Sequence, residues 1–218
     1  MDYMNTAAFF DLDDTIIKGN SGMSCAFHYF LTGRISLWQS IRIAYDYFFY
    51  FVGKSDPYKF FENIYFFLKG KNYKSEEKFC ARYFDKKIKQ NIYEEAINQI
   101  NWHKKQGHLV VIITNSLNIM VSRIEKYIDV DFFIATTLNE QKGTFTGTTK
   151  DINYGKNKVK HVKELAKKLN IDLKKSYAYS DNNSDIPMLS TVGKPVATNP
   201  QSKMRKYAIK NNWKIKIF

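Results

Sequence analysis

Two aspartates near the start of the chain, Asp11 and Asp13, have the type and spacing of a catalytic carboxylate pair. They follow the apolar stretch 7–10, which is typical of a buried strand, and strand alternation would point both carboxylates to the same side. Two carboxylates so close are unfavourable unless a cation lies between them or one takes a proton. A divalent cation such as Mg²⁺ would stabilise the pair and leave one carboxylate able to attack an electrophile. The alternative is an ordinary strand end with solvated aspartates.

Polar residues suited to phosphoryl chemistry also follow the later apolar stretches, and ligands collect at the carboxyl ends of parallel strands. A helix expected after Asn115 would offer free backbone N–H groups to a phosphate. Lys158, at the start of another predicted helix, would add one positive charge. Metal, nucleophile and phosphate donors together indicate phosphoryl transfer. On plainer interpretations Thr114 is a helix cap and Lys158 a solvated lysine. The remaining residues of this set are Thr114, Asn115, Asp181 and Asp185.

The chain changes from helical to alternating strand and helix patterning near residue 90. Residues 24–90 have helical periodicity and contain no convincing strand, so they are predicted to be a helical insertion. Repeated strand–helix units after it indicate a right-handed, mostly parallel α/β sheet. We therefore expect a core of residues 1–17 and 91–218 and a helical unit of residues 18–90. Later strands are expected at 109–113, 131–135, 177–180 and 195–197, a hairpin within 137–149, and helices at 93–105 and 156–169.

Composition excludes several classes of protein. With 218 residues, 44% of them hydrophobic, the chain can bury a substantial core. The net charge of +13 admits nucleic acid, an anionic membrane or an anionic substrate. The lysines are spread along the chain without a nucleic-acid-binding motif, so we expect no nucleic-acid partner. No apolar run suits a membrane span, the first strand begins too early for a signal peptide, and two cysteines lack C-x-x-C spacing. These features predict a cytoplasmic protein.

One helical stretch is unusually aromatic. Packing against neighbouring helices would explain part of this content. The alternative is an apolar surface that contacts lipid or an apolar substrate tail, helped by the basic charge. Peripheral contact with an anionic membrane is therefore a second hypothesis for this stretch. The aromatic residues concerned are Trp38, Tyr45, Tyr47, Phe48, Phe49, Tyr50 and Phe51.

Four motifs in order resemble those of the haloacid dehalogenase (HAD) superfamily, most closely the phosphoserine-phosphatase-like subfamily IB. Each motif alone is weak, but the ordered set covers nearly the whole predicted core. The resemblance implies a Rossmann-like core and makes residues 18–90 similar to a C1-type helical cap. The four motifs are Asp11-Leu12-Asp13-Asp14-Thr15, the stretch 110–113 ending in Thr114, Lys158 within 155–159, and Ser180 to Asp185.

The resemblance also implies a mechanism, that of a Mg²⁺-dependent phosphomonoesterase. Asp11 would attack phosphorus and form an aspartyl-phosphate, while Asp13 would protonate the leaving oxygen and later activate water. Thr114, Asn115 and Lys158 would bind the phosphoryl oxygens. The Mg²⁺ ligands would be Asp11, the Asp13 backbone carbonyl and Asp181, with Asp185 supporting the metal from nearby.

The expected substrate is a small or lipid-like phosphate ester. Two alternatives remain: a phosphoserine phosphatase proper, or a membrane-surface binding protein on the same fold. Phosphoserine phosphatases use a glutamate after the first motif and a cap arginine for the ammonium and carboxylate of phosphoserine. Here Asn20 occupies the first of these positions, and 54–81 contains no arginine. We therefore expect no preference for phosphoserine, unless Arg34 or Arg42 reaches the substrate.

Overall fold

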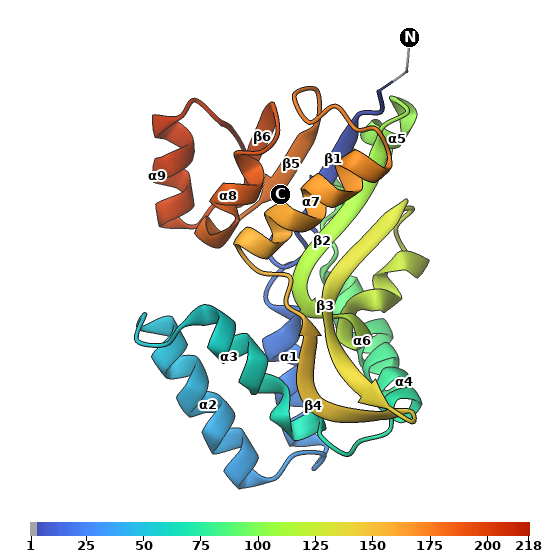
Figure 1. Ribbon diagram of the computed structural model, residues 1–218, viewed down its shortest axis with the longest axis vertical. Helices are drawn as coiled ribbons and strands as arrows, with labels where there is room; N and C mark the ends of the chain where they lie inside the picture. Colours follow the sequence, from blue (N-terminus) through green and yellow to red (C-terminus); the bar gives the residue numbers. More distant parts are fainter. Residues whose placement is uncertain (1–3) are drawn as a thin grey trace.

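A sheet of seven strands forms the centre of the protein in the computed structural model, which describes residues 4–218. The strand order is β4-β3-β2-β1-β5-β6-β7, and neighbouring strands are parallel except β3 and β4 (Figure 1). This arrangement confirms the mostly parallel α/β sheet that the sequence predicts. The strands are β1 (Ala7–Phe10), β2 (Leu109–Leu117), β3 (Phe132–Gln141), β4 (Thr144–Asp151), β5 (Tyr177–Ser180), β6 (Lys194–Thr198) and β7 (Lys214–Lys216).

Helices pack on the sheet and also extend beyond the end of β1 (Figure 1). The helices that follow β1 directly in the chain are called the helical segment below, and one of them, α4, lies beside α6 of the sheet region.

The helices of the sheet region are α5 (Glu94–Lys105), α6 (Asn118–Val121), η4 (Ser122–Lys126), α7 (Lys156–Lys168), η5 (Asn183–Asp185), α8 (Ile186–Leu189) and α9 (Ser202–Lys210). The helical segment consists of α1 (Ser21–Leu31), α2 (Leu37–Phe51), α3 (Pro57–Asn63), η1 (Ile64–Leu68), α4 (Tyr73–Tyr83), η2 (Phe84–Ile88) and η3 (Lys89–Asn91).

Short polar side chains set where the four longer helices of this segment begin. Each accepts a hydrogen bond from a backbone N–H of the first helical turn, which satisfies a donor that has no partner inside the helix. The capping residues are Asn20 for α1, Ser36 for α2, Asp56 for α3 and Asn72 for α4. None of the helices in residues 4–218 combines the length and the apolar character needed to cross a membrane.

Alternation along the central strand divides the hydrophobic core between the two faces of the sheet. Ala7 and Phe9 belong to a cluster that includes residues of α7, α8 and α9. Ala8 and Phe10 belong to a second cluster, which continues into α5, α6 and the helical segment. Successive side chains of a strand point to opposite faces, so β1 is fully buried because helices cover both of them. Its carboxyl end is thereby held at a fixed place.

Main-chain hydrogen bonds join the β3–β4 hairpin to the helical segment. Gly70 N donates to Phe145 O over 2.9 Å, and Phe145 N donates to Lys71 O over 3.0 Å. Tyr73 N donates to Gly143 O over 2.9 Å. The hairpin therefore fixes the stretch between η1 and α4 against the sheet.

The structure corrects the expected layout of this hairpin. A strand at 131–135 and a separate hairpin within 137–149 were predicted, but β3 runs without a break from Phe132 to Gln141. Register shifts in the pairing of β3 with β4 accommodate the added length. The same strand thus pairs with β2 at one end and contributes to the hairpin at the other.

His103 of α5 is a fully buried imidazole that the fold keeps neutral. Its Nε2 lies 2.8 Å from Tyr179 Oη, and its Nδ1 lies 2.8 Å from His108 Nδ1. Burial, reinforced by the neighbouring His108, lowers the pKa of His103 to about 3. In the unfolded chain His103 has its ordinary pKa of 6.5, so between that pH and about pH 3 it binds a proton that it does not bind in the folded protein.

We expect acid to destabilise the fold through this group. Between about pH 6.5 and about pH 3, His103 should lower the free energy of unfolding by about 1.4 kcal/mol for each unit of pH decrease. The effect is absent above the unfolded pKa, where both states are neutral. Urea unfolding at several pH values would measure it. The variant His103→Gln should lose stability less steeply toward low pH, and parallel curves for the two proteins would contradict the prediction.

Candidate active site

The two aspartates that follow β1 lie in the wall of one cavity. Asp11 is almost completely buried, and its backbone N–H still donates to Tyr179 O on β5, so the sheet positions it. Asp13 is held through both carboxylate oxygens. Its Oδ1 accepts from Ser21 N at 3.0 Å, and its Oδ2 accepts from Ser116 Oγ at 2.8 Å. The pair is therefore fixed by hydrogen bonds and is not a solvated strand end.

Lys158 joins two buried carboxylates. Its Nζ lies 2.7 Å from Asp11 Oδ1 and 2.7 Å from Asp185 Oδ2, and only 2% of the residue is exposed. Ser180 Oγ donates to the same Asp185 oxygen over 2.8 Å. Burial alone would lower the pKa of Lys158, but the two carboxylates raise it above its ordinary value. This lysine is therefore a fixed positive charge beside Asp11, and it is not the solvated surface lysine of the plainer interpretation.

A glycine allows α7 to begin where Lys158 can reach the strand ends. Gly155 precedes the helix with a φ of 50°, in the left-handed region that side chains with a Cβ rarely adopt. A Cβ at this position would lie 3.3 Å from Tyr58 Oη. The first turn of α7 therefore sits close against the helical segment, and Lys158 points from that turn into the sheet end.

Asp181 follows β5 and contributes a third carboxylate to the cavity wall. Gln201 Nε2 donates to its Oδ2 over 3.0 Å. Burial, followed by repulsion from Asp11, raises the pKa of Asp181 to about 8. Burial also raises the pKa of Asp11, to about 7, despite the opposing charge of Lys158. Repulsion from Asp185 adds to the effect of burial at Asp11, so the carboxylates of this site disfavour one another's negative charge.

A cation would relieve this repulsion. Whether that cation can be Mg²⁺ depends on the oxygen ligands that the site offers. In residues 4–218 no group of three His, Cys, Asp or Glu side chains has the arrangement of a metal site. Mg²⁺ does not require one, because it commonly binds one or two carboxylates and keeps several water ligands. Within the described part of the chain, Asp185 Oδ1 is also buried without a hydrogen-bond partner. Two mutually repelling carboxylates and an unsatisfied acidic oxygen suit a hard cation.

Thr114 and Asn115 also line the cavity, but not at the start of a helix. The sequence predicted that a helix with free N–H groups follows Asn115. This prediction is wrong, because β2 continues to Leu117 and the four-residue α6 begins at Asn118 without a side-chain cap. Asn153 Nδ2 stabilises the extended backbone by donating to Thr114 O over 2.8 Å. The Ser116 hydroxyl instead donates to Asp13.

Sequence reasoning missed the part that four residues play in orienting the carboxylates: Ser21, Ser116, Ser180 and Gln201. Ser21 and Ser116 hold Asp13 and are 2.9 Å apart at their hydroxyl oxygens, whereas Ser180 holds Asp185 and Gln201 holds Asp181. Ser180 gave the clearest signal, since it directly precedes the acidic stretch. The other three carry none, because serine and glutamine are common at turns and surfaces.

The cavity has a volume of about 910 Å³ and lies between the strand ends and the helical segment. Its core side carries the five acidic residues and two lysines of the lining. Among the described residues, the helical segment contributes no charged side chain to the walls, which there are largely aromatic. The charged lining residues are Asp11, Asp13, Asp14, Asp181, Asp185, Lys158 and Lys203; the aromatic ones of the segment are Tyr47, Phe48, Tyr50, Phe51, Phe61 and Tyr65.

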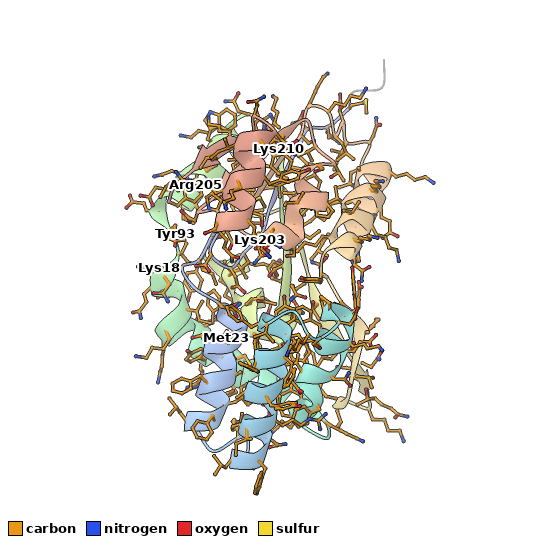
Figure 2. All side chains as sticks on the ribbon, turned by 90° about the vertical axis from the view of Figure 1, so that its left-hand side faces the viewer. Lys18, Met23, Tyr93, Lys203, Arg205 and Lys210 are labelled. Atoms are coloured by element: carbon orange, nitrogen blue, oxygen red, sulfur yellow. The ribbon has the colours of Figure 1, made fainter. Side chains whose placement is uncertain are left out.

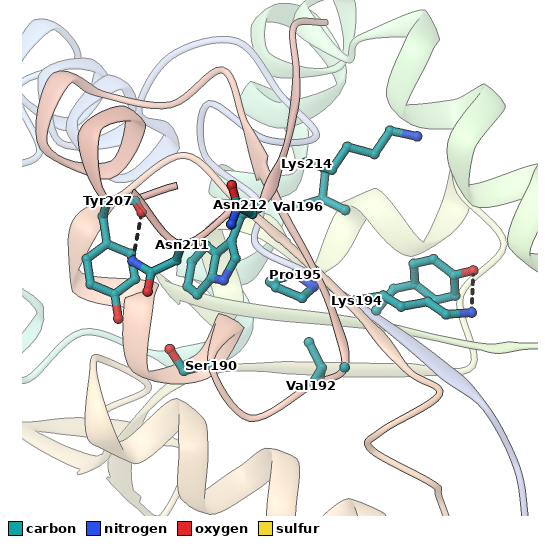
Figure 3. A pocket seen from close by; sticks show the side chains of 12 residues that line it. Ser190, Val192, Lys194, Pro195, Val196, Tyr207, Asn211, Asn212 and Lys214 are labelled. Atoms are coloured by element: carbon teal, nitrogen blue, oxygen red, sulfur yellow. Dashed lines mark hydrogen bonds between the residues drawn. The ribbon is translucent and has the colours of Figure 1, made fainter. Parts of the chain in front are cut away.

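A second cavity, of about 640 Å³, lies elsewhere (Figure 3). It is bordered by Lys194 and Pro195 at the start of β6 and by the turn after α9. Lys194 Nζ donates to Tyr177 Oη over 3.0 Å across one end of it. Its twelve lining residues include no carboxylate. This cavity is at the amino end of β6, whereas Asp11, Asp13 and Asp181 follow the carboxyl ends of β1 and β5, and Thr114 and Asn115 lie in the last part of β2.

Comparison with known proteins identifies the relatives of this chain. A family model described as haloacid dehalogenase-like hydrolase matches residues 8–190. A Streptomyces azureus protein named for inhibition of morphological differentiation is 34% identical, over 98% of this chain and 78% of its own length. A Mycobacterium tuberculosis phosphoserine phosphatase is 28% identical, over 99% and 71% of the respective chains. A crystal structure of a Bordetella pertussis protein of unknown function superposes with a TM-score of 0.89 at 23% identity, covering 98% of this chain and 99% of that one.

Proposed function

Because the chain belongs to the haloacid dehalogenase-like hydrolases and is a phosphatase, we propose that it hydrolyses phosphate monoesters through an aspartyl-phosphate on Asp11, with Mg²⁺ as cofactor. The observation that carries this proposal is the buried bridge from Lys158 to Asp11 and Asp185. It places a fixed cation next to a carboxylate at the base of a cavity. A phosphoryl group held there would meet a nucleophile and a compensating charge together.

Asp11 is the proposed nucleophile because hydrogen bonds fix both its backbone, through Tyr179 O, and its carboxylate, through Lys158. Lys158 holds Oδ1, so attack on phosphorus falls to the other carboxylate oxygen. The bond to phosphorus forms as the ester oxygen leaves, which gives an aspartyl-phosphate and an alcohol. The lysine then lies beside the phosphoryl oxygens, where Thr114 and Asn115 also line the cavity. These three residues are the proposed phosphate-binding groups.

Asp13 is the proposed general acid and base. Ser21 N and Ser116 Oγ fix its carboxyl group, and burial raises its pKa above the ordinary aspartate value. The raised pKa favours the protonated form of Asp13, which is the form that a general acid requires. Asp13 would give that proton to the leaving oxygen. It would then take a proton from the water that attacks the aspartyl-phosphate.

The Mg²⁺ ligands proposed are the carboxylates of Asp11 and Asp181 and the backbone carbonyl of Asp13. Asp185 would support them from nearby through its contact with Lys158. When bound, Mg²⁺ would neutralise charge on the carboxylates and on the phosphoryl oxygens. The raised pKa values of Asp11 and Asp181 support this assignment, because two groups that resist ionisation together are those that a cation stabilises.

Release of phosphate from p-nitrophenyl phosphate tests the proposal. Turnover with Mg²⁺ that EDTA removes, and that added Mg²⁺ restores, is the expected result. A purified, folded protein without turnover on this ester or on a broad panel of phosphate monoesters would overturn the phosphomonoesterase assignment. It would favour a binding protein on the same fold.

We further propose that residues 18–90 act as the cap over a core of residues 1–17 and 91–218. The aromatic cavity wall contributed by the helical segment supports this division and points to a substrate with an apolar part. Such a substrate would be a small aromatic or lipid-like phosphate ester. The charged phosphate would face the core, and the rest of the molecule would contact the aromatic wall.

Phosphoserine is expected to be a poor substrate. An enzyme specific for it must pair the ammonium and the carboxylate, and leaving either buried without a partner costs orders of magnitude in specificity. Among the described residues no arginine lines the cavity. Arg34 is paired with Glu76 at 2.7 Å, and Arg42 lies over the ring of Phe66 at 4.0 Å.

We expect kcat/KM for L-phosphoserine to be no higher than for several esters without an amino acid group. A steady-state panel that includes p-nitrophenyl phosphate, glycerol phosphate and L-phosphoserine measures this. The matched comparison is phosphoethanolamine, which keeps the ammonium and lacks the carboxylate. A kcat/KM for L-phosphoserine about a hundredfold above every other ester would contradict the prediction.

A further inference from the structure

Helices α1 and α2 carry many exposed large apolar side chains, which together are called the apolar face below. Trp38 is 80% exposed and Phe51 is 88% exposed. All fifteen residues of α2 belong to the part of the chain that the structure describes. Only Ile43 among them is buried. Soluble monomers rarely expose so many large apolar side chains together, so such a surface marks a contact site. Its principal residues are Phe27, Leu31, Trp38, Ile41, Tyr45 and Phe51.

The charges around this face suit an anionic surface. In the sequence from residue 21 to residue 53 the only acidic residue is Asp46, and Arg42 lies 3.8 Å from it. On the same side of the molecule, α9 presents Lys203, Arg205 and Lys210 above the helical segment (Figure 2). Basic side chains next to an exposed aromatic helix are the pattern of a protein that lies on an anionic lipid layer.

The apolar face is continuous with the catalytic cavity. Met23, Phe48 and Phe51 are exposed at the face and also line the cavity. Lys203 lines it from the core, and Figure 2 shows Lys203 and Met23 on the same side of the molecule. An amphiphile held at this face would therefore find an aromatic wall for its apolar part and Lys158 for its phosphate. If a second copy of the chain bound the apolar face instead, the connection between the face and the cavity would serve no purpose.

We propose that the apolar face binds an anionic lipid surface and that the cavity takes a phosphate monoester whose apolar part remains in that lipid layer. The substrate class rests on the phosphatase function proposed above, whereas the membrane contact does not. The apolar side chains of α1 and α2 would enter the outer part of the lipid layer. The basic residues of α9 would lie against the anionic headgroups.

Co-sedimentation with vesicles tests the membrane contact independently of catalysis. Vesicles of phosphatidylcholine and phosphatidylglycerol in equal amounts should bind the protein at low salt, and pure phosphatidylcholine vesicles should bind it far less. The double variant Trp38→Gln/Ile41→Gln should weaken binding by about tenfold or more, because both side chains lose apolar area that would enter the lipid. Neither residue lines the cavity, so turnover of p-nitrophenyl phosphate should stay unchanged.

The matched control is Trp102→Gln/Ile217→Gln, which makes the same changes at exposed positions outside the face. It should bind vesicles as the unmodified protein does. Equal binding by both double variants, or no binding of the unmodified protein at low salt, would overturn the membrane contact. A dimer in solution that only Trp38→Gln/Ile41→Gln dissociates, without vesicle binding, would assign the face to a second copy.

Activity on phosphatidic acid tests the substrate class. In mixed vesicles, phosphate release from phosphatidic acid should exceed release from glycerol phosphate, and Trp38→Gln/Ile41→Gln should reduce only the former. Activity on p-nitrophenyl phosphate without activity on phosphatidic acid would overturn the lipid substrate and leave the proposed phosphatase intact. Vesicle binding without turnover of any ester would instead overturn the phosphatase proposal and keep the membrane contact.

Discussion

Asp11→Asn is expected to lower kcat by at least about four orders of magnitude, because it removes the group that forms the covalent intermediate. The amide keeps the shape of the carboxyl group but is a poor nucleophile and carries no charge for a metal ion. The fold should tolerate the change, since burial already raises the pKa of Asp11 and a neutral group suits the site. Turnover of p-nitrophenyl phosphate with saturating Mg²⁺ measures the loss.

Two comparisons make this result specific. Asp129→Asn changes a largely exposed aspartate and should leave kcat unchanged. Asp13→Asn should also lower kcat, but Asp11 can still attack there, so acid-quenched protein should retain phosphate on Asp11. If Asp11→Asn kept kcat within about tenfold of the unmodified enzyme, Asp11 would not be the nucleophile.

Lys158→Met is expected to have the largest effect on stability, about 3 kcal/mol in the free energy of unfolding. Lys158 is the cation between Asp11 and Asp185, and its removal leaves two buried carboxylates without their partner. Activity should fall by about a hundredfold or more, because the phosphoryl oxygens lose a fixed positive charge. Urea unfolding and turnover of p-nitrophenyl phosphate measure the two losses separately.

The sign of the pH dependence identifies the cause of this loss. In Lys158→Met, Asp11 would lose the charge that opposes the effect of burial, so its pKa in the folded state would rise further above the ordinary value of 3.8. The variant's free energy of unfolding should therefore fall, relative to the unmodified protein, as pH rises through the pKa of about 7 that Asp11 has in the unmodified protein. Lys160→Met removes an exposed lysine two positions further along α7 and should change neither stability nor activity. A destabilisation independent of pH would assign Lys158 a packing role instead.

That the candidate residues line one cavity could be predicted from their positions relative to apolar stretches of the sequence. Asp11, Asp13, Thr114, Asn115 and Asp181 each come directly or nearly directly after one. Parallel strands bring such positions to one end of the sheet. Lys158 and Asp185 were candidates on the same grounds, but the roles proposed for them came from the resemblance to a family, since a lysine at a helix start and an aspartate in a turn are common.

The local structure after β2 could not be predicted in the same way. Polar residues after an apolar run normally indicate a strand end, and serine is a common helix cap. Here Asn153 Nδ2 donates to Thr114 O, and Ser116 Oγ donates to Asp13, over sequence separations of 39 and 103 residues. These tertiary hydrogen bonds extend the strand, and a local pattern contains no information about them.

Which side of α2 faces outward could not be predicted from the sequence either. Apolar residues lie on several sides of α2, so its periodicity does not identify the buried side. Packing of Trp38, Tyr45 and Phe48 inside the segment was one hypothesis, but all three are exposed. These three residues are therefore at the surface, and their contact with lipid stays a proposal.

The attachment of the hairpin to the stretch between η1 and α4 has a consequence for the way substrate enters. A swing of the whole helical segment would have to break the main-chain hydrogen bonds of Gly70, Phe145 and Tyr73. Release of α2 would break only side-chain contacts, chiefly those of buried Ile43 and of Tyr47 and Tyr50, which pack on α3. Regions with few buried contacts open at the lowest free energy. We therefore expect α2 alone to move away from the cavity while the rest of the helical segment stays in place. If α2 also rests on lipid, contact with the lipid layer would favour this open position of α2. The enzyme would then be more active at a lipid surface than in solution, which is interfacial activation.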